Sequence, residues 1–256
     1  MKDIEVKILN PEQLASADTM MVAMARLTQR AQNIKNMADF EALLAKPYKE
    51  STAETMVKLP HPTLQKFGLI NVAVVGASRR FLAQITRHQN EVKFMSGSLQ
   101  YSDYSDEAQF CVPYAVTNYD AVHNTGGWAR RQYLNSCLQS MDDYKKAVKY
   151  IGNDAAGYMA PQGMRNVLLI SALPYELKHI ISQRSCNRNT LETQYVMLKI
   201  WEQLWDLSPM FRHGCGPECM QQGCQEGRMT CGDPYFKSST PTDILHYRFP
   251  LLYKEG

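Results

Sequence analysis

The chain has 256 residues, of which 45% are hydrophobic and 21% are charged, and its formal net charge is +3. These values are ordinary for a globular protein, and the charge is too small to indicate a surface that binds nucleic acid. No apolar run approaches the roughly 18 residues that cross a membrane, and the polar start of the chain lacks the core of a signal peptide. We therefore expect a cytoplasmic protein with one large domain or one domain and an appendage.

The first part of the chain is predicted to be helical up to a buried strand. Apolar residues recur at helical spacing over 11–30, where Pro11 suits a first turn, and shorter helices are expected over 39–45 and 52–58. The run 69–75 is rich in β-branched residues and lies between glycines, which predicts a buried strand. Ser78 is a good N-cap for a helix over 79–88.

The helix over 79–88 carries hydrogen-bond donors on one face. Arg80, Gln84 and Arg87 fall at positions i, i+4 and i+7. Two guanidinium groups and an amide suit a phosphate or a uracil-like ring. The segment that follows alternates hydroxyl, glycine and amide groups, as a loop that hydrogen-bonds a ligand would. From chemistry alone, a solvated helix face followed by a polar turn is an equally good interpretation.

The second half of the chain is predicted to contain three longer helices and a short strand. Apolar residues at spacings of three and four predict a helix over 128–151, which Gly152 ends. A strand is expected over 166–170. Further helices are expected over 174–183 and 190–207, and we expect Trp201 and Trp205 on the latter to face the core or a subunit interface.

Four of the seven cysteines crowd into the last fifth of the chain, on a glycine-rich segment. The odd total and the absence of a signal peptide argue against a disulfide framework. Thiolates spaced C-x3-C-x4-C-x6-C could bind zinc tetrahedrally, although this is not the spacing of a standard zinc finger. Reduced cysteines without a metal are the simpler interpretation. The candidate metal ligands are Cys215, Cys219, Cys224 and Cys231.

Several motifs resemble those of the flavin-dependent thymidylate synthases over roughly residues 60 to 206. Arg87-His88-Gln89, followed by Ser98-Leu99-Gln100-Tyr101-Ser102, is similar to the family signature of Arg-His-Arg, seven residues, Ser, and a nearby Arg-Tyr-Ser. His179 and Arg184 keep the spacing of the family's (His or Asn)-x4-Arg motif, and Glu192 that of a glutamate on the next helix. Some members also carry a similar cysteine-rich tail.

The resemblance implies a fold, a reaction and an assembly. The fold is of the α/β (α+β) class, with a central, mostly antiparallel sheet flanked by long helices. We expect a single catalytic domain over 1–210 and a cysteine-rich tail over 211–256. The implied reaction is the reductive methylation of dUMP to dTMP, with FAD as cofactor and with NADPH and methylenetetrahydrofolate as co-substrates. The implied assembly is a homotetramer with sites between subunits, and no nucleic-acid or membrane partner is expected.

The resemblance also implies roles for individual residues. The cofactor-binding candidates are Arg87, His88, Gln89 and His179. The substrate-binding candidates are Gln84, Ser98, Gln100 and Arg184. Of these, Arg184 and Ser98 are the catalytic candidates.

The chain departs from the family pattern at positions that usually bind flavin or nucleotide, which are occupied here by Phe67, Gln89, Gln100, Gly157 and Leu173. Each lost arginine removes charge-assisted contacts of roughly 1.5–3 kcal/mol. One alternative is therefore a related flavin-dependent modification at C5 of another pyrimidine nucleotide, such as hydroxymethylation. A second alternative, from a different class, is a zinc-binding protein whose tail contacts nucleic acid.

Overall fold

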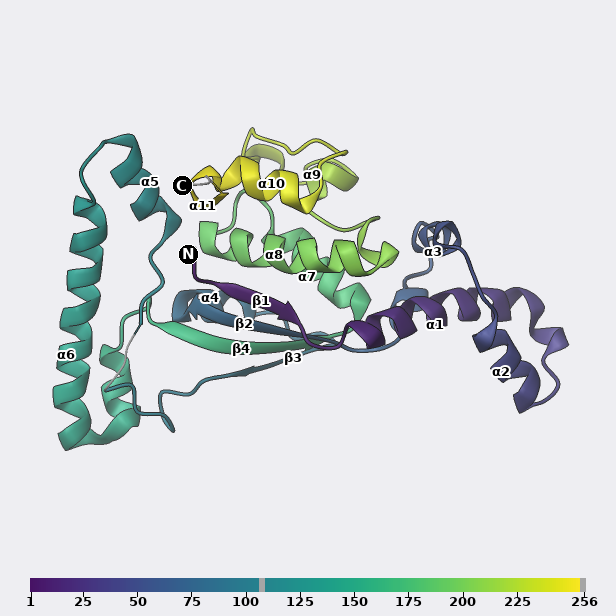
Figure 1. Cartoon of the computed structure of the whole chain (residues 1–256), viewed down its shortest axis with the longest axis horizontal. Coiled ribbons are helices and arrows are strands. Elements are labelled where there is room, and N and C mark those ends of the chain that lie inside the picture. The colour runs from purple at the N-terminus through teal and green to yellow at the C-terminus, as the bar shows by residue number, and fades with distance from the viewer. Residues whose placement is uncertain (106–108, 254–256) are drawn as a thin grey trace.

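A computed structural model describes residues 1–105 and 109–253 and shows a four-stranded sheet (Figure 1). The strand order is β1 (Glu5–Ile8), β2 (Ile70–Ser78), β4 (Arg165–Ala172) and β3 (Val92–Ser96). Every neighbouring pair is antiparallel, which confirms the expected fold class. The register of β2 against β4 shifts between Val75 and Ala77, where Gly76 has a φ of +86° that favours glycine.

The helices surround this sheet on one face and at both ends. The α-helices are α1 (Pro11–Arg30), α2 (Met37–Ala45), α3 (Glu50–Val57), α4 (Arg79–Ile85), α5 (Tyr114–Val122), α6 (Trp128–Ala156), α7 (Pro174–Arg184), α8 (Leu191–Leu207), α9 (Glu218–Gln221), α10 (Pro241–Arg248) and α11 (Pro250–Tyr253). The short 3-10 helices are η1 (Ala31–Asn33), η2 (Pro62–Gln65), η3 (Gly157–Met159), η4 (Pro209–Phe211) and η5 (Gly227–Met229). The predictions over 11–30, 174–183 and 190–207 are confirmed as α1, α7 and α8. No helix among the described residues is long and apolar enough to span a membrane.

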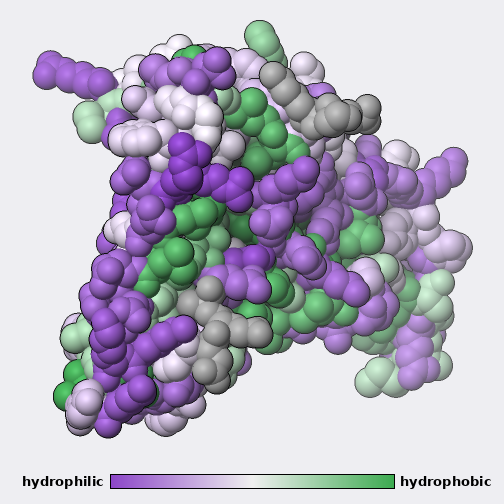
Figure 2. Space-filling model, turned by 60° about the vertical axis from the view of Figure 1, so that its left-hand side comes forward, coloured by the Kyte–Doolittle hydropathy of each residue, from purple (hydrophilic) through white to green (hydrophobic). Residues whose placement is uncertain are grey.

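The two faces of the sheet differ in their surroundings. Alternate residues of β2 and β4, such as Val72, Val74 and Ile170, are fully buried beneath α8 and its neighbours, as the period of a half-buried strand requires. In Figure 1, α7, α8 and α10 lie above the sheet, and no labelled helix of the described residues lies directly beneath it. On that open face Val75 and Val167 are 41% and 55% exposed. Figure 2 shows apolar surface gathered in a hollow on the side of the molecule that it presents.

Helix α6 stands apart from the main body, as Figure 1 shows. It packs along α5 and η3 around a small core of its own, which includes Met141, Tyr144 and Met164. Gly152, which was predicted to end the helix, has a φ of +74°, and one further helical turn follows it. Helix α6 therefore has a small apolar core that is separate from the main core on the sheet.

The segment after α8 packs back onto the main core. Ile244, Leu245 and Phe249 are buried in the same cluster as Trp201 of α8. Trp201 also donates its indole N–H to the carbonyl oxygen of Phe211 at 2.9 Å. The division into a domain over 1–210 and a tail over 211–256 stays a prediction, but the tail shares the core of α8.

Candidate functional site

Helix α4 is held firmly at its start. The hydroxyl oxygen of Ser78 accepts the backbone N–H of Phe81 at 3.2 Å, which is the predicted N-cap. Glu192, at the start of α8, accepts the backbone N–H of Ser78 at 2.6 Å and its hydroxyl at 2.5 Å. Phe81 and Ile85 bury the inner face of the helix. These contacts fix the position of α4 against the core, and therefore the position of Arg87 and His88, which follow it.

Four of the predicted site residues lie near one another, because Arg87 and His88 follow α4 while His179 and Arg184 lie on α7. Of these, His88 and Arg184 are in direct contact. Nε of Arg184 donates a hydrogen bond to Nε2 of His88 at 2.8 Å. Because arginine is a donor only, the accepting imidazole nitrogen carries no proton and the His88 ring is neutral. The ring of His179 lies edge-on to His88, with 6.4 Å between the ring centroids.

The electrostatics agree with this neutral form of His88. The side chain is 9% exposed, and burial lowers its pKa to about 4, with smaller contributions from the positive charges of Arg184 and His179. Burial is the largest of these causes because it penalises the charged imidazolium. His88 therefore orients Arg184 as an uncharged acceptor at neutral pH.

Two guanidinium groups meet at this point without a carboxylate. Burial, followed by the nearby charge of Arg87, lowers the pKa of Arg184. Among the described residues neither arginine has a carboxylate within 4 Å. Arg184 also donates to the side-chain oxygen of Asn189 at 3.3 Å. Paired cations without a counter-charge favour an anionic or carbonyl-rich ligand.

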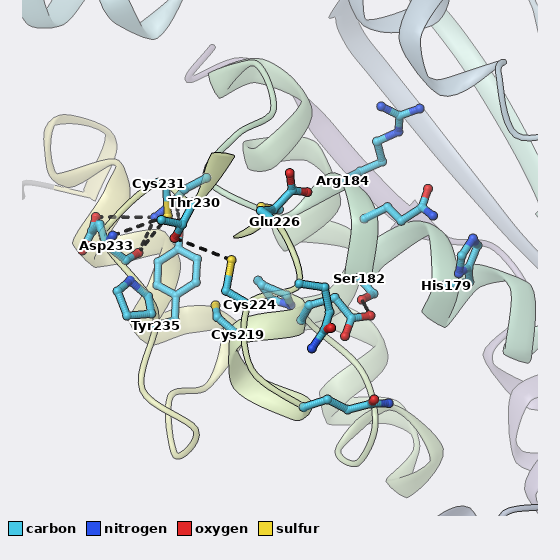
Figure 3. A pocket seen from close by; sticks show the side chains of 18 residues that line it. His179, Ser182, Arg184, Cys219, Cys224, Glu226, Thr230, Cys231, Asp233 and Tyr235 are labelled. Atoms are coloured by element: carbon cyan, nitrogen blue, oxygen red, sulfur yellow. Dashed lines mark hydrogen bonds between the residues drawn. The ribbon is translucent and has the colours of Figure 1, made fainter. Parts of the chain in front are cut away.

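A cavity of about 610 Å³, which we call the α7 cavity, lies between this end of α7 and the tail. Figure 3 shows His179, Ser182 and Arg184 on one side of it and Cys219, Cys224, Cys231 and Tyr235 on the other. Its volume is in the range of pockets that hold small molecules and cofactors. The tail thus supplies one wall of the cavity that the predicted residues of α7 line.

The described part of the structure does not support the predicted metal site. Among the described residues, which include every cysteine, no three His, Cys, Asp or Glu side chains are placed to hold a metal ion. Cys215 is buried, and burial raises the pKa of its thiol to about 12. Cys219, Cys224 and Cys231 line the α7 cavity, with Cys186 from the α7–α8 loop rather than Cys215 beside them. The regular spacing in sequence does not bring the four tail thiols to one point.

The structure places the remaining predicted residues in two groups. Gln84 lies against the start of α8, where its side-chain oxygen accepts the hydroxyls of Thr190 at 3.0 Å and Thr193 at 2.8 Å. Gln89 is exposed beside His88. Ser98 and Gln100 lie on the loop after β3 and line neither the α7 cavity nor the cavity beside it. In one chain these two residues are therefore separate from Arg184.

Sequence reasoning missed several residues that build the site. Asn189, Thr190 and Thr193 position Arg184 and Gln84, but polar residues at the start of a helix carry no distinctive signal. Glu192 was noted for its spacing only, and its contact with Ser78 joins segments 114 residues apart. Glu218 and Glu226 enter the α7 cavity from the tail, where no pattern pointed to them.

The fold, the cluster of arginine and histidine side chains beside α4 and on α7, and the adjoining cavity define an α/β protein with a small-molecule site. The family model described as thymidylate synthase complementing protein matches residues 12–210, and the chain belongs to this family. It is an enzyme of the flavin-dependent thymidylate synthase type, as the resemblance of its motifs predicted. The family assignment also replaces the alternative of a zinc-dependent nucleic-acid-binding protein.

Comparison with individual proteins agrees with the family. The flavin-dependent thymidylate synthase of Geobacter sulfurreducens is 23% identical over 184 residues, which cover 70% of this chain and 75% of the relative. That of Thermococcus onnurineus is 24% identical over 177 residues, which cover 66% and 69%.

Two solved structures show the same fold. Thymidylate synthase X from Helicobacter pylori, solved with FAD and dUMP, has a TM-score of 0.56 at 15% identity, with 84% of this chain and 98% of that chain covered. The UMP/dUMP methylase PolB from Streptomyces cacaoi, bound with 5-Br dUMP, has a TM-score of 0.62 at 15% identity, with 83% and 94% covered.

Proposed function

We propose that the protein catalyses the reductive methylation of dUMP to dTMP with FAD, NADPH and methylenetetrahydrofolate. The observation that supports this most strongly is the contact between His88 and Arg184 beside Arg87 and His179. It brings together, from two distant segments, four of the residues that the family motifs assign to flavin and nucleotide. The match of the family model over 12–210 supports the same reaction class.

The donor set fits FAD and a nucleotide. Arg87 and Arg184 have no carboxylate partner among the described residues, so phosphate oxygens or ring carbonyls are suitable acceptors for them. FAD, when bound, supplies the hydride chemistry of the reaction, whereas the protein positions and charges the site. We assign Arg87, His88, Gln89 and His179 to the cofactor, and Gln84 and Arg184 to the nucleotide.

The neutral state of His88 gives Arg184 its role in this proposal. His88 accepts from Nε, so the two terminal nitrogens of Arg184 remain to serve Asn189 and a ligand. A guanidinium fixed in this way loses little conformational entropy when it binds a phosphate or a pyrimidine carbonyl. The tail supplies the wall of the α7 cavity that faces α7, so a ligand bound beside Arg184 would be enclosed between the two segments.

We further propose that Ser98 and Gln100 reach the nucleotide from another subunit of a homotetramer. Leu99 packs over Gly157, where a Cβ would lie 3.3 Å from that of Leu99, so the loop that carries both residues has a defined position. The open face of the sheet exposes Met95, Val167 and Val75, and such a surface favours burial against another copy. The mass of the assembly in solution tests this part of the proposal.

A related C5 modification of another pyrimidine nucleotide is the second candidate. It is favoured by Gln89, Gln100 and Gly157, which stand where the family usually has residues that bind flavin or nucleotide. Absorbance near about 450 nm in the purified protein tests the flavin. Equilibrium titration with dUMP and with UMP then tests the substrate, and failure of both to bind would reject a pyrimidine monophosphate.

A further inference from the structure

A second cavity of about 400 Å³ adjoins the α7 cavity along α7. It is bounded by the segment that leads into η2, by the N-terminal half of α7 and by the start of the tail. The two cavities share the side chains of His179, Ser182, Glu218 and Gln222. We call it the Lys178 cavity, because a buried lysine lines it that none of the family motifs includes.

Lys178 is only 6% exposed, yet no carboxylate balances its charge. Its Nζ donates to the side-chain oxygen of Gln65 at 2.8 Å and to the backbone oxygen of His213 at 2.6 Å. Both acceptors are neutral, and no carboxylate among the described residues lies within 4 Å of Nζ. An ammonium group has three donors, so one N–H has no acceptor in the described part of the chain.

The groups around Lys178 do not supply the missing negative charge. Glu218 lines the cavity, but its carboxylate accepts the hydroxyl of Ser182 at 3.1 Å and makes no ion pair within 4 Å of Nζ in the described part of the chain. Cys215 is close, but burial raises the pKa of its thiol to about 12 and keeps it neutral. The other polar side chains that line the cavity include His61, His179 and Tyr175, none of which is a carboxylate.

The space beside Nζ is open because residue 214 is glycine. Gly214 also lines the cavity, its φ is +59°, and a Cβ built on it would lie 3.6 Å from Nζ. Burial without a counter-charge is unfavourable for an ammonium, and it lowers the pKa of Lys178 to about 8. An anion placed next to Nζ would relieve this cost.

We propose that the Lys178 cavity binds the phosphate or carboxylate group of a small molecule, with Lys178 as its charged donor. The proposal does not depend on which pyrimidine is the substrate, because it concerns a different charge and a different cavity. The competing interpretation is that Lys178 only ties the tail to η2 through Gln65 and His213. The two interpretations differ in whether the protein takes up a proton with an anion.

The test is isothermal titration calorimetry of the full chain at pH 8, with inorganic phosphate and separately with glutarate, in two buffers of different ionisation enthalpy. A bound anion raises the pKa of Lys178, so we expect uptake of about half a proton per anion. Phosphate alone would identify a phosphate group, and glutarate alone a carboxylate group. Binding of neither anion with proton uptake would overturn the proposal.

Variants locate the anion. Lys178→Met should abolish the proton uptake and weaken binding by at least about tenfold, whereas Lys199→Met, which removes a lysine paired with Glu202 on α8, should change neither. If Lys178→Met fails to fold, Gln222→Glu tests the same cavity with Lys178 in place. Gln225→Glu is its control, because Gln225 lines the α7 cavity only. Equal weakening by both glutamates, or full binding by Lys178→Met, would place the anion at Arg184 and reject the proposal.

Discussion

Nε of Arg184 lies 2.8 Å from Nε2 of His88 and donates a hydrogen bond to it, which joins the C-terminal end of α7 to the segment after α4. The two residues are 96 positions apart in sequence. The bond requires a neutral imidazole, and burial of His88 favours that state. It thereby fixes the guanidinium of Arg184 beside the α7 cavity, where the proposed function places the nucleotide.

Replacing Arg184 should weaken nucleotide binding without unfolding the protein. Arg184→Met removes a charge-assisted contact of roughly 1.5–3 kcal/mol, so the Kd for dUMP should rise about 10- to 100-fold. Equilibrium titration measures this change. Arg131→Met is a matched control, since Arg131 donates to the carbonyl of Gly126 far from the cavity, at the start of α6. An unchanged Kd in Arg184→Met would remove Arg184 from the site.

The protein should lose stability in acid through His88. Its pKa is lowered to about 4 in the folded state from an ordinary value of about 6.5, so the unfolded state binds more protons between these values. The stabilising contribution is complete above pH 6.5 and is lost as the pH falls toward 4, by at most about 3 kcal/mol.

Urea unfolding across this pH range measures the loss. The His88→Gln variant, whose amide oxygen still accepts from Arg184, should have a smaller pH dependence of the free energy of unfolding than the parent protein. Equal slopes for the two proteins would show that His88 does not titrate as proposed.

Asp18 should lower the free energy of unfolding at neutral pH, whereas the neutral His88 raises it. Burial raises the pKa of its carboxyl to about 6, although the hydroxyl of Ser208 donates to it at 2.8 Å. The folded state therefore binds more protons than the unfolded state between about pH 4 and 6, and the charged form above pH 6 is destabilising. Asp18→Asn should raise the free energy of unfolding at pH 8, by about 1–2 kcal/mol, and leave it little changed at pH 4. A loss of stability at pH 8 would contradict this account.

The contact between the tail and α8 should be sensitive at Gly216. This glycine has a φ of +93°, and a Cβ on it would overlap the Trp201 ring. Gly216→Ala should therefore lower the free energy of unfolding by about 2–4 kcal/mol, from both backbone strain and overpacking. Gly223→Ala isolates the strain, because Gly223 has a similar φ of +94° with nothing within 4 Å of its Cβ. Equal losses in the two variants would show that the tail does not pack tightly on Trp201.

The sequence predicted the elements whose signals are local. Helical periodicity located α1, α7 and α8 to within a residue at each end, and Ser78 marked the start of α4 correctly. The strand β1 and the edge strand β3 were missed, because they are only four and five residues long and each mixes charged with apolar residues. Their pairing with distant strands decides their structure, and such pairing leaves no local pattern.

In the candidate site, too, only the residues with a recognisable sequence motif were predicted. The motifs identified Arg87, His88, His179 and Arg184, and the fold brings them together. The cysteine spacing suggested a metal site, but Cys215 is buried in the core cluster that includes Trp201, and Cys186 lines the α7 cavity with the other three tail cysteines. Lys178 carried no signal at all, since only burial without a carboxylate makes it notable.

The most direct test of the proposed function is the product formed from dUMP by the purified protein with FAD, NADPH and methylenetetrahydrofolate. Mass analysis of the nucleotide should show dTMP with the parent protein and with Arg131→Met, and a loss of at least about tenfold in rate with Arg184→Met. Protein that holds FAD and binds dUMP but leaves it unmethylated would contradict the assignment of the reaction.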